Sequence, residues 1–161
     1  MRVLMATLAA SVLLISAAWA QTADVAAKPL TDTDIQLMRS DIQAQKEQII
    51  AHTMQFTDAE STAFWPVYRD YSHDQYAIGS ERVELIKDYA KNFDTLDDVK
   101  AKELTQRMLD LEAKNVNLRQ DYWPKFAKAL GAKRAAKFYQ VDNRLTLMIN
   151  VQLASEIPLI P

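Results

Sequence analysis

Residues 57–92, TDAESTAFWPVYRDYSHDQYAIGSERVELIKDYAKN, carry the pattern that decides the fold. From Phe64 to Tyr89, mostly apolar side chains recur at alternating spacings of four and three residues, which places them on one side of an α-helix. The members of this stripe are Phe64, Tyr68, Tyr71, Gln75, Ile78, Arg82, Leu85 and Tyr89. A second stripe runs beside it from Trp65 to Phe93. The two stripes predict one long helix over about 57–92 with a wide apolar face.

The start of this helix is marked by a capping pattern. Thr57 and Glu60 have the spacing of a capping box, in which each side chain bonds the other residue's backbone N–H. Phe56 precedes Thr57 and is placed to make the apolar contact that often accompanies such a box.

A second long helix is predicted over about 97–130, after a short acidic turn. Its stripe again alternates four and three: Leu104, Met108, Leu111, Asn115, Leu118 and Tyr122. Matching stripes joined by a short turn indicate an antiparallel helical hairpin. Folding it about residues 94–95 places Gln75 near Asn115. It also places Arg82 near Met108, with Glu103 or Glu112 within reach.

Two shorter helices flank the hairpin, over about 32–53 and 132–154. The first is expected to bury Ile35, Met38, Ile42, Gln45, Ile49 and His52. The last follows Gly131 and is expected to bury Ala135, Phe138, Val141, Leu145, Met148, Ile149 and Leu153. The predicted fold is all-α with four helices in a single domain over residues 31–161, after a flexible leader over 21–30. Proline at 158 ends the last helix by Glu156.

The first twenty residues have the organisation of a cleavable signal peptide. Arg2 precedes an apolar run, and Ala18-Trp19-Ala20 places small residues where a signal peptidase reads them. We therefore expect cleavage between Ala20 and Gln21 and a periplasmic location. A retained anchor is the alternative, but residues 3–20 are short for a spanning helix.

Composition narrows the classes of function. The 161 residues carry 19 basic and 21 acidic side chains, a net charge of −2, whereas a nucleic-acid binder needs a clear basic excess. The chain has no cysteine, so packing alone must hold the fold. We expect no nucleic-acid partner and no integral membrane segment after removal of the signal.

Motifs for catalysis, cofactors and metals are weak in this chain. Two glycines cannot build a phosphate-binding loop, and no nucleophile motif occurs. The two histidines, His52 and His73, fall on different predicted helices, whereas zinc needs three or four protein ligands. We expect a protein that is not an enzyme and has no catalytic residues, cofactor or metal site.

One aromatic motif occurs twice. Phe64-Trp65-Pro66 is echoed by Tyr122-Trp123-Pro124, and the hairpin should bring the two Trp-Pro units together. These aromatics are either core residues or a platform for a partner. The chain ends with the apolar segment 157–161. The candidate partner-binding residues are Trp65, Tyr68, Tyr76, Trp123, Phe126, Ile157, Leu159 and Ile160.

These features together resemble the LTXXQ group of bacterial periplasmic proteins, which includes the Spy-like and CpxP-like proteins. The characteristic element takes the form Phe56-Thr57-Asp58-Ala59-Glu60, with Phe for Leu and Glu for Gln. Residues 130–140, LGAKRAAKFYQ, also resemble the last helix of small exported proteins related to this group. The resemblance covers most of residues 30–160.

The resemblance implies a helical cradle that dimerises and holds unfolded envelope proteins without ATP, as a chaperone or an adaptor in an envelope-stress response. The alternative is a structural or regulatory partner of one specific envelope protein. A third reading is a periplasmic metal sensor, although the His-rich and Met-rich segments of metal-binding relatives are missing. The wide face of the helix over 57–92 also suggests a homodimer.

Overall fold

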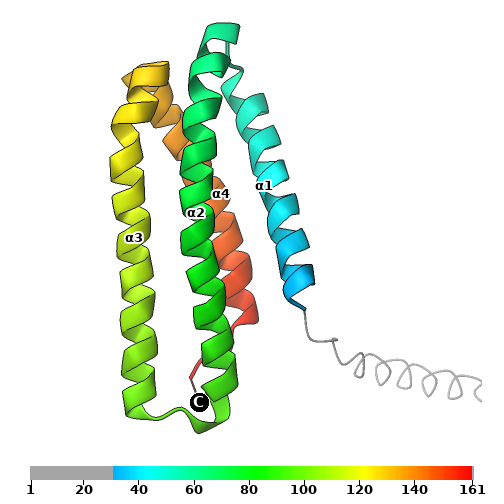
Figure 1. Cartoon of the computed structure of the whole chain (residues 1–161), viewed down its shortest axis with the longest axis vertical. Helices are drawn as coiled ribbons and strands as arrows, with labels where there is room; N and C mark the ends of the chain where they lie inside the picture. The colour runs from blue at the N-terminus through cyan, green and yellow to red at the C-terminus, as the bar shows by residue number, and fades with distance from the viewer. Residues whose placement is uncertain (1–30, 161) are drawn as a thin grey trace, which may run out of the picture. The chain divides into compact units, whose positions relative to one another are not determined.

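A computed structural model describes residues 31–160 and contains four α-helices (Figure 1). They are α1 (Asp32–Met54), α2 (Asp58–Asn92), α3 (Asp98–Leu130) and α4 (Ala132–Glu156), with a short 3-10 helix, η1 (Phe93–Thr95), between α2 and α3. The all-α prediction is confirmed, and each predicted boundary lies within about two residues of the observed one. The predicted signal peptide over residues 1–20 and the predicted leader over 21–30 both lie outside the described residues.

The chain divides into two compact units, residues 1–40 and 41–161. The boundary falls inside α1. In the first unit, the described part is the start of α1, where Thr31 and Asp34 form a reciprocal cap: the Thr31 N–H donates to Asp34 Oδ2 over 2.9 Å, and the Asp34 N–H donates to Thr31 Oγ1 over 3.2 Å.

The α2–α3 hairpin is the main scaffold. Figure 1 shows the two helices side by side, with η1 at their shared turn. The Thr57 capping box forms as predicted, since Glu60 N–H donates to Thr57 Oγ1 over 3.3 Å and Thr57 N–H donates to Glu60 Oε2 over 2.9 Å. Phe56 stacks near Phe64, with ring centroids 4.5 Å apart. These local interactions fix the start of α2.

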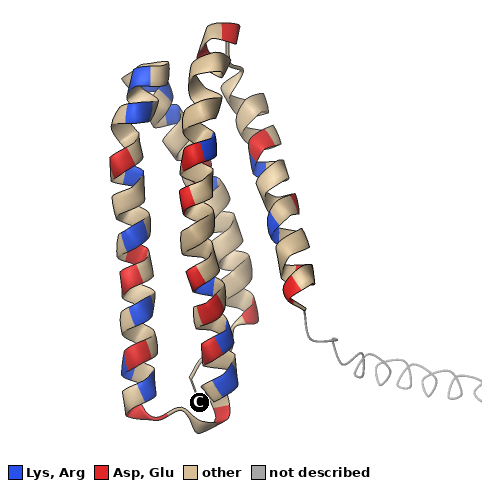
Figure 2. Cartoon of the chain, in the orientation of Figure 1, with Lys and Arg blue, Asp and Glu red and all other residues tan. Residues whose placement is uncertain are grey.

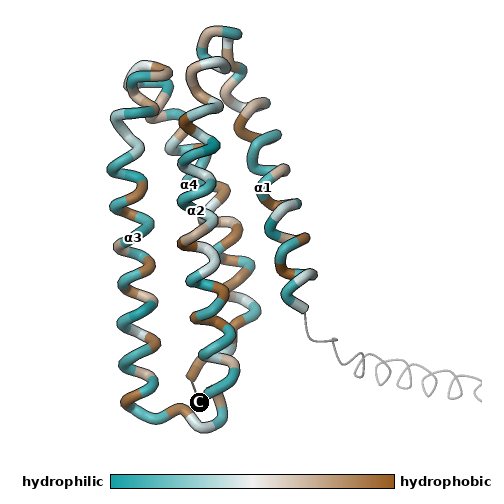
Figure 3. The backbone as a smooth tube through the Cα atoms, in the orientation of Figure 1, coloured by the Kyte–Doolittle hydropathy of each residue, from teal (hydrophilic) through white to brown (hydrophobic). Residues whose placement is uncertain are grey.

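The core is concentrated where the end of α1 meets α2, α3 and α4. Its buried residues are Ile50, Met54, Phe64, Tyr68, Tyr71, Tyr122, Phe126, Leu130, Ala135 and Phe138. Phe126 and Phe138 lie 4.5 Å apart between ring centroids, and each also packs on Phe64. The helices that carry the two aromatic motifs thus meet through Phe64 and Phe126, whereas Trp65 packs on Phe64 and Tyr68 and Trp123 packs on Tyr139. The hydropathy colouring shows apolar and polar residues alternating along each of these helices (Figure 3).

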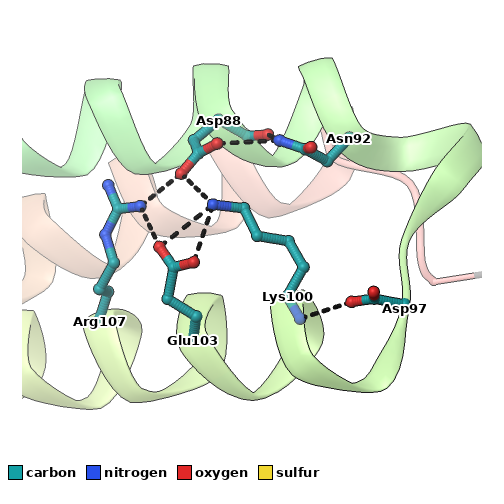
Figure 4. Close-up of polar contacts among 6 residues, drawn as sticks. All are labelled: Asp88, Asn92, Asp97, Lys100, Glu103 and Arg107. Carbon is teal, nitrogen blue, oxygen red and sulfur yellow. Dashed lines mark hydrogen bonds and ion pairs between the residues drawn. The ribbon is translucent and has the colours of Figure 1, made fainter.

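The end of the hairpin near η1 has a smaller core and a charged cluster. Leu85, Leu104 and Leu111 form the core there. Beside it, Asp88 of α2 accepts hydrogen bonds from Lys100 and Arg107 of α3 (Figure 4). Glu103 bonds the same two cations, so four charges alternate in sign across the hairpin. The bonds from Lys100 and Arg107 lower the pKa of the Asp88 carboxyl below its usual range.

The packing predicted for the two flanking helices was wrong in part. The expected core stripe of α1 is largely exposed: Met38, Ile42 and Ile49 are surface residues, as are Gln45 and His52. The helix instead buries Lys46, Ile50 and Met54, because polar partners for Lys46 exist in the fold. In α4, Met148 and Leu153 are exposed rather than buried.

The polar pairs expected across the hairpin are also replaced. Gln75 bonds Tyr71 and Lys46, while Asn115 donates to its own helix at Leu111 O. Arg82 donates to Asn150 of α4 rather than to an acidic residue of α3. The prediction considered only α2 and α3, whereas in the folded chain α1 and α4 supply closer partners.

Candidate functional site

A closed ring of four polar side chains links α1, α2 and α4 inside the protein. Lys46 Nζ lies 3.2 Å from Asp142 Oδ1, and Tyr71 Oη donates to Asp142 Oδ2 over 2.9 Å. Gln75 completes the ring, because its Nε2 donates to Tyr71 Oη over 2.8 Å and its Oε1 accepts from Lys46 Nζ over 3.4 Å. Asp142 is 1% exposed and Lys46 is 8% exposed.

The environment of the ring suits an ion pair that is shielded from water. The Lys46–Asp142 contact is an ion pair rather than an aligned hydrogen bond, since no described group donates to Asp142 Oδ1 with good geometry. Burial raises the pKa of Tyr71, and the negative charge of Asp142 raises it further. Tyr71 therefore keeps its proton and remains a hydrogen-bond donor to Asp142 at neutral and mildly alkaline pH.

A second polar contact joins α1 to α2 one turn before Lys46. Gln43 Nε2 donates to Ser72 Oγ over 2.7 Å and lies 3.4 Å from Tyr68 Oη. Burial raises the pKa of Tyr68 as well, so its phenol also stays neutral. The inner face of α1 therefore docks largely through polar groups.

The end of α1 is held by cations of α4. Lys137 Nζ donates to Thr53 O over 2.8 Å, and Arg134 donates to Met54 O over 2.8 Å. Arg134 also forms an ion pair with Glu60 at the start of α2. These bonds satisfy carbonyls that a helix end leaves without an intrahelical donor.

The aromatic candidates for partner binding occupy different environments. Tyr68 and Phe126 are fully buried in the core. Trp65 is half-buried and packs edge-on against Phe64 and Tyr68. Trp123 and Tyr76 are exposed, by 38% and 43%. Trp123 still packs edge-on against Tyr139, with ring centroids 5.5 Å apart.

The tail candidates lie past the end of α4. Tyr89 Oη donates to Pro158 O over 2.9 Å, which ties the tail to α2. Ile157 is half-buried, and Leu159 and Ile160 are exposed. The structure therefore brings none of the tail residues to the aromatic core, and the eight candidates do not form one site.

An exposed apolar surface lies on the second half of α4. Residues 145–155, LTLMINVQLAS, contain no charged side chain, and the second half of α4 is largely tan in Figure 2. Leu147, Met148 and Val151 are 53%, 69% and 69% exposed. We call these three residues the α4 apolar surface. These three residues lie within about one helical turn, and Leu153, 39% exposed, follows them.

Sequence reasoning missed both the ring and the α4 apolar surface. Asp142 could have been noticed, because it interrupts the apolar series Phe138, Val141, Leu145 with a charge. The signal for Lys46 was weaker: Lys46, Ile50 and Met54 are spaced four residues apart, which places Lys46 on the same side of the helix as two apolar residues. A charge within an apolar series points to a buried pair, but its partner is visible only in three dimensions.

The described part of the chain contains neither a metal cluster nor a membrane-spanning helix. Within residues 31–160 there is no group of three or more His, Cys, Asp or Glu side chains placed to hold a metal ion. In the same range no helix is long and apolar enough to cross a membrane.

Comparisons with known proteins do not assign this chain to a family. No family model, no curated protein and no solved structure matches this chain, and the resemblance to the LTXXQ group stays a prediction.

Proposed function

We propose that this protein is an exported binding module that holds unfolded envelope proteins without ATP. The observation that carries the proposal is the α4 apolar surface, formed by Leu147, Met148 and Val151 in an uncharged stretch of helix. Contiguous exposed apolar side chains mark sites that bind other apolar surfaces. Unfolded chains present such segments without a fixed shape, and a helix face can accept them without a shaped pocket.

The proposed location is the periplasm, after cleavage between Ala20 and Gln21. A passive binder suits that compartment, because binding through apolar contacts needs no nucleotide. The alternating charges along the hairpin keep the remainder of the surface well hydrated (Figure 2).

The test is suppression of aggregation by residues 21–161. A client unfolded by denaturant is diluted into buffer, and light scattering is followed with increasing amounts of the protein. We expect suppression near equimolar ratios. No suppression at several-fold excess would reject the proposal.

A matched pair of variants assigns the activity to a surface. Leu147→Gln/Met148→Gln/Val151→Thr makes the α4 apolar surface polar and should weaken suppression. Val99→Gln changes one exposed apolar residue, 78% exposed, at the start of α3 and should leave suppression unchanged. Equal activity in both variants would place client binding elsewhere.

A specific docking role is the second candidate, favoured by the exposed tail. Leu159 and Ile160 are 89% and 58% exposed, and the tail is tied to α2 by the Tyr89 bond to Pro158. Deletion of residues 157–161 should abolish binding to one specific partner but leave aggregation suppression intact. Affinity purification from envelope extract with both forms separates the two roles.

A further inference from the structure

The way α1 is attached sets it apart from the other helices. Within Asp41–Met54, the side that faces α2 and α4 presents Gln43 and Lys46, and only Ile50 and Met54 join the core. The apolar residues Ile42 and Ile49 point away from the core and are 37% and 43% exposed. Most of the bonds that hold this helix are therefore polar.

Polar attachment makes α1 easier to release than an apolar helix of the same length. Burial of the Lys46 and Asp142 charges carries a desolvation cost that offsets much of their attraction. When α1 leaves, Lys46, Gln43 and Asp142 regain water. Elements with few buried apolar contacts are those that open at the lowest free energy.

The connection between α1 and α2 has the features of a hinge. Residues 55–57 join the helices, and Gln55 has φ 47°, a left-handed conformation that is unfavourable for a residue with a side chain. Thr57 and Glu60 cap α2 without help from α1. Opening of α1 about residues 55–57 breaks only a few bonds at this end, those from Arg134 to Met54 O and from Lys137 to Thr53 O.

Movement of α1 would uncover aromatic rings. Ile50 and Met54 belong to the same core as Phe64, Tyr68 and Phe138, which are all 0% exposed. Tyr68 also loses its Gln43 contact when α1 leaves. The uncovered face would be rich in large rings, which contribute strongly to binding of apolar polypeptide.

We propose that residues 41–54 are a hinged cover, and that the aromatic face beneath them is a second binding surface for unfolded apolar segments. The inference rests on the proposed function and adds where clients bind and what controls access. It also assigns a role to buried Tyr68, which a rigid core would keep from any partner.

A removable cross-link tests the cover. The chain has no cysteine, so Gln43→Cys/Ser72→Cys introduces a unique pair that links α1 to α2. A bis-methanethiosulfonate linker is used, because Gln43 reaches Ser72 through its whole side chain, and reductant removes it. The control is Glu81→Cys/Lys114→Cys, an exposed ion pair across α2 and α3 that leaves α1 free. The client is a cysteine-free protein.

The expected result is that linking residues 43 and 72 removes most of the aggregation suppression and that reductant restores it. Linking residues 81 and 114 should leave suppression unchanged. If both linked proteins keep full activity, or both lose it alike, the cover is rejected. Full activity in both would still leave the proposed function intact.

Hydrogen exchange provides a readout that needs no client. In the unlinked protein, amides of residues 43–52 should exchange faster than those of residues 64–75 of α2, and the 43–72 link should slow them. Equal exchange in the two segments would reject the cover. If the unlinked proteins show no suppression, the proposed function fails, and exchange alone decides whether α1 opens.

Discussion

Replacing Lys46 alone should destabilise the protein, whereas replacing Lys46 and Asp142 together should not. Lys46→Met leaves the Asp142 carboxylate, 1% exposed, without its cation. Loss of one partner from a buried ion pair costs about 3–5 kcal/mol. We expect that loss in denaturant unfolding of the single variant.

The double variant Lys46→Met/Asp142→Leu is the control. Apolar replacement of a whole buried pair is often neutral or stabilising. We expect the free energy of unfolding to recover to within about 1 kcal/mol of the original protein. A double variant as unstable as the single one would show that the ring contributes more than its ion pair.

Tyr71 makes the free energy of unfolding depend on pH in the alkaline range. Burial and the charge of Asp142 raise the pKa of Tyr71, so above about pH 10 the unfolded chain releases a proton that the folded chain keeps. The folded state then binds more protons than the unfolded state, and stability falls as pH rises. Tyr71→Phe should make the slope of unfolding free energy shallower by about 1.4 kcal/mol per pH unit. Identical slopes for the two proteins would contradict this.

At the scale of elements, α2 depends on its own cap. Thr57→Ala removes the Oγ1 acceptor of the Glu60 N–H and should lower the free energy of unfolding by about 1 kcal/mol. Thr62→Ala, one turn later on an exposed site, removes only a bond to Asp58 O and should change it by less than about 0.5 kcal/mol. If thermal unfolding shows the same loss of stability for both variants, the Thr57 cap contributes no more than an ordinary exposed threonine.

The charged cluster near η1 joins the last turns of α2 to the first turns of α3. Asp88→Asn removes the acceptor shared by Lys100 and Arg107. The cluster is partly open to solvent, so salt screens these ion pairs and the destabilisation should shrink as salt is raised. Thermal unfolding of both proteins at low and high salt measures this. A salt-independent difference would point to packing instead.

At the scale of the whole molecule, exposed apolar side chains favour self-association. Leu109 and Val116 of α3 and Leu147 of α4 are each about half exposed. Burial of such residues between two copies would release water from apolar surface. We predict that residues 21–161 form a homodimer, visible in sedimentation as a mass that rises with concentration. The triple variant of the α4 apolar surface should shift that equilibrium toward monomer.

The helices could be predicted because their determinants are local. The four-and-three spacing from Phe64 to Tyr89, the Thr57 box and Gly131 each act over a few residues. Gly131 adopts φ 77°, a conformation that other residues reach at a cost. The all-α class and the helix boundaries followed from such signals alone.

Which side of each flanking helix faces the core was decided by the tertiary structure. In α1, the apolar stripe through Ile42 and Ile49 competed with a mixed face through Lys46 and Ile50. The mixed face became buried because Asp142, far along the chain, provides the charge that Lys46 needs. A period in the sequence defines a face of a helix, but its burial depends on groups that only the folded chain brings within reach.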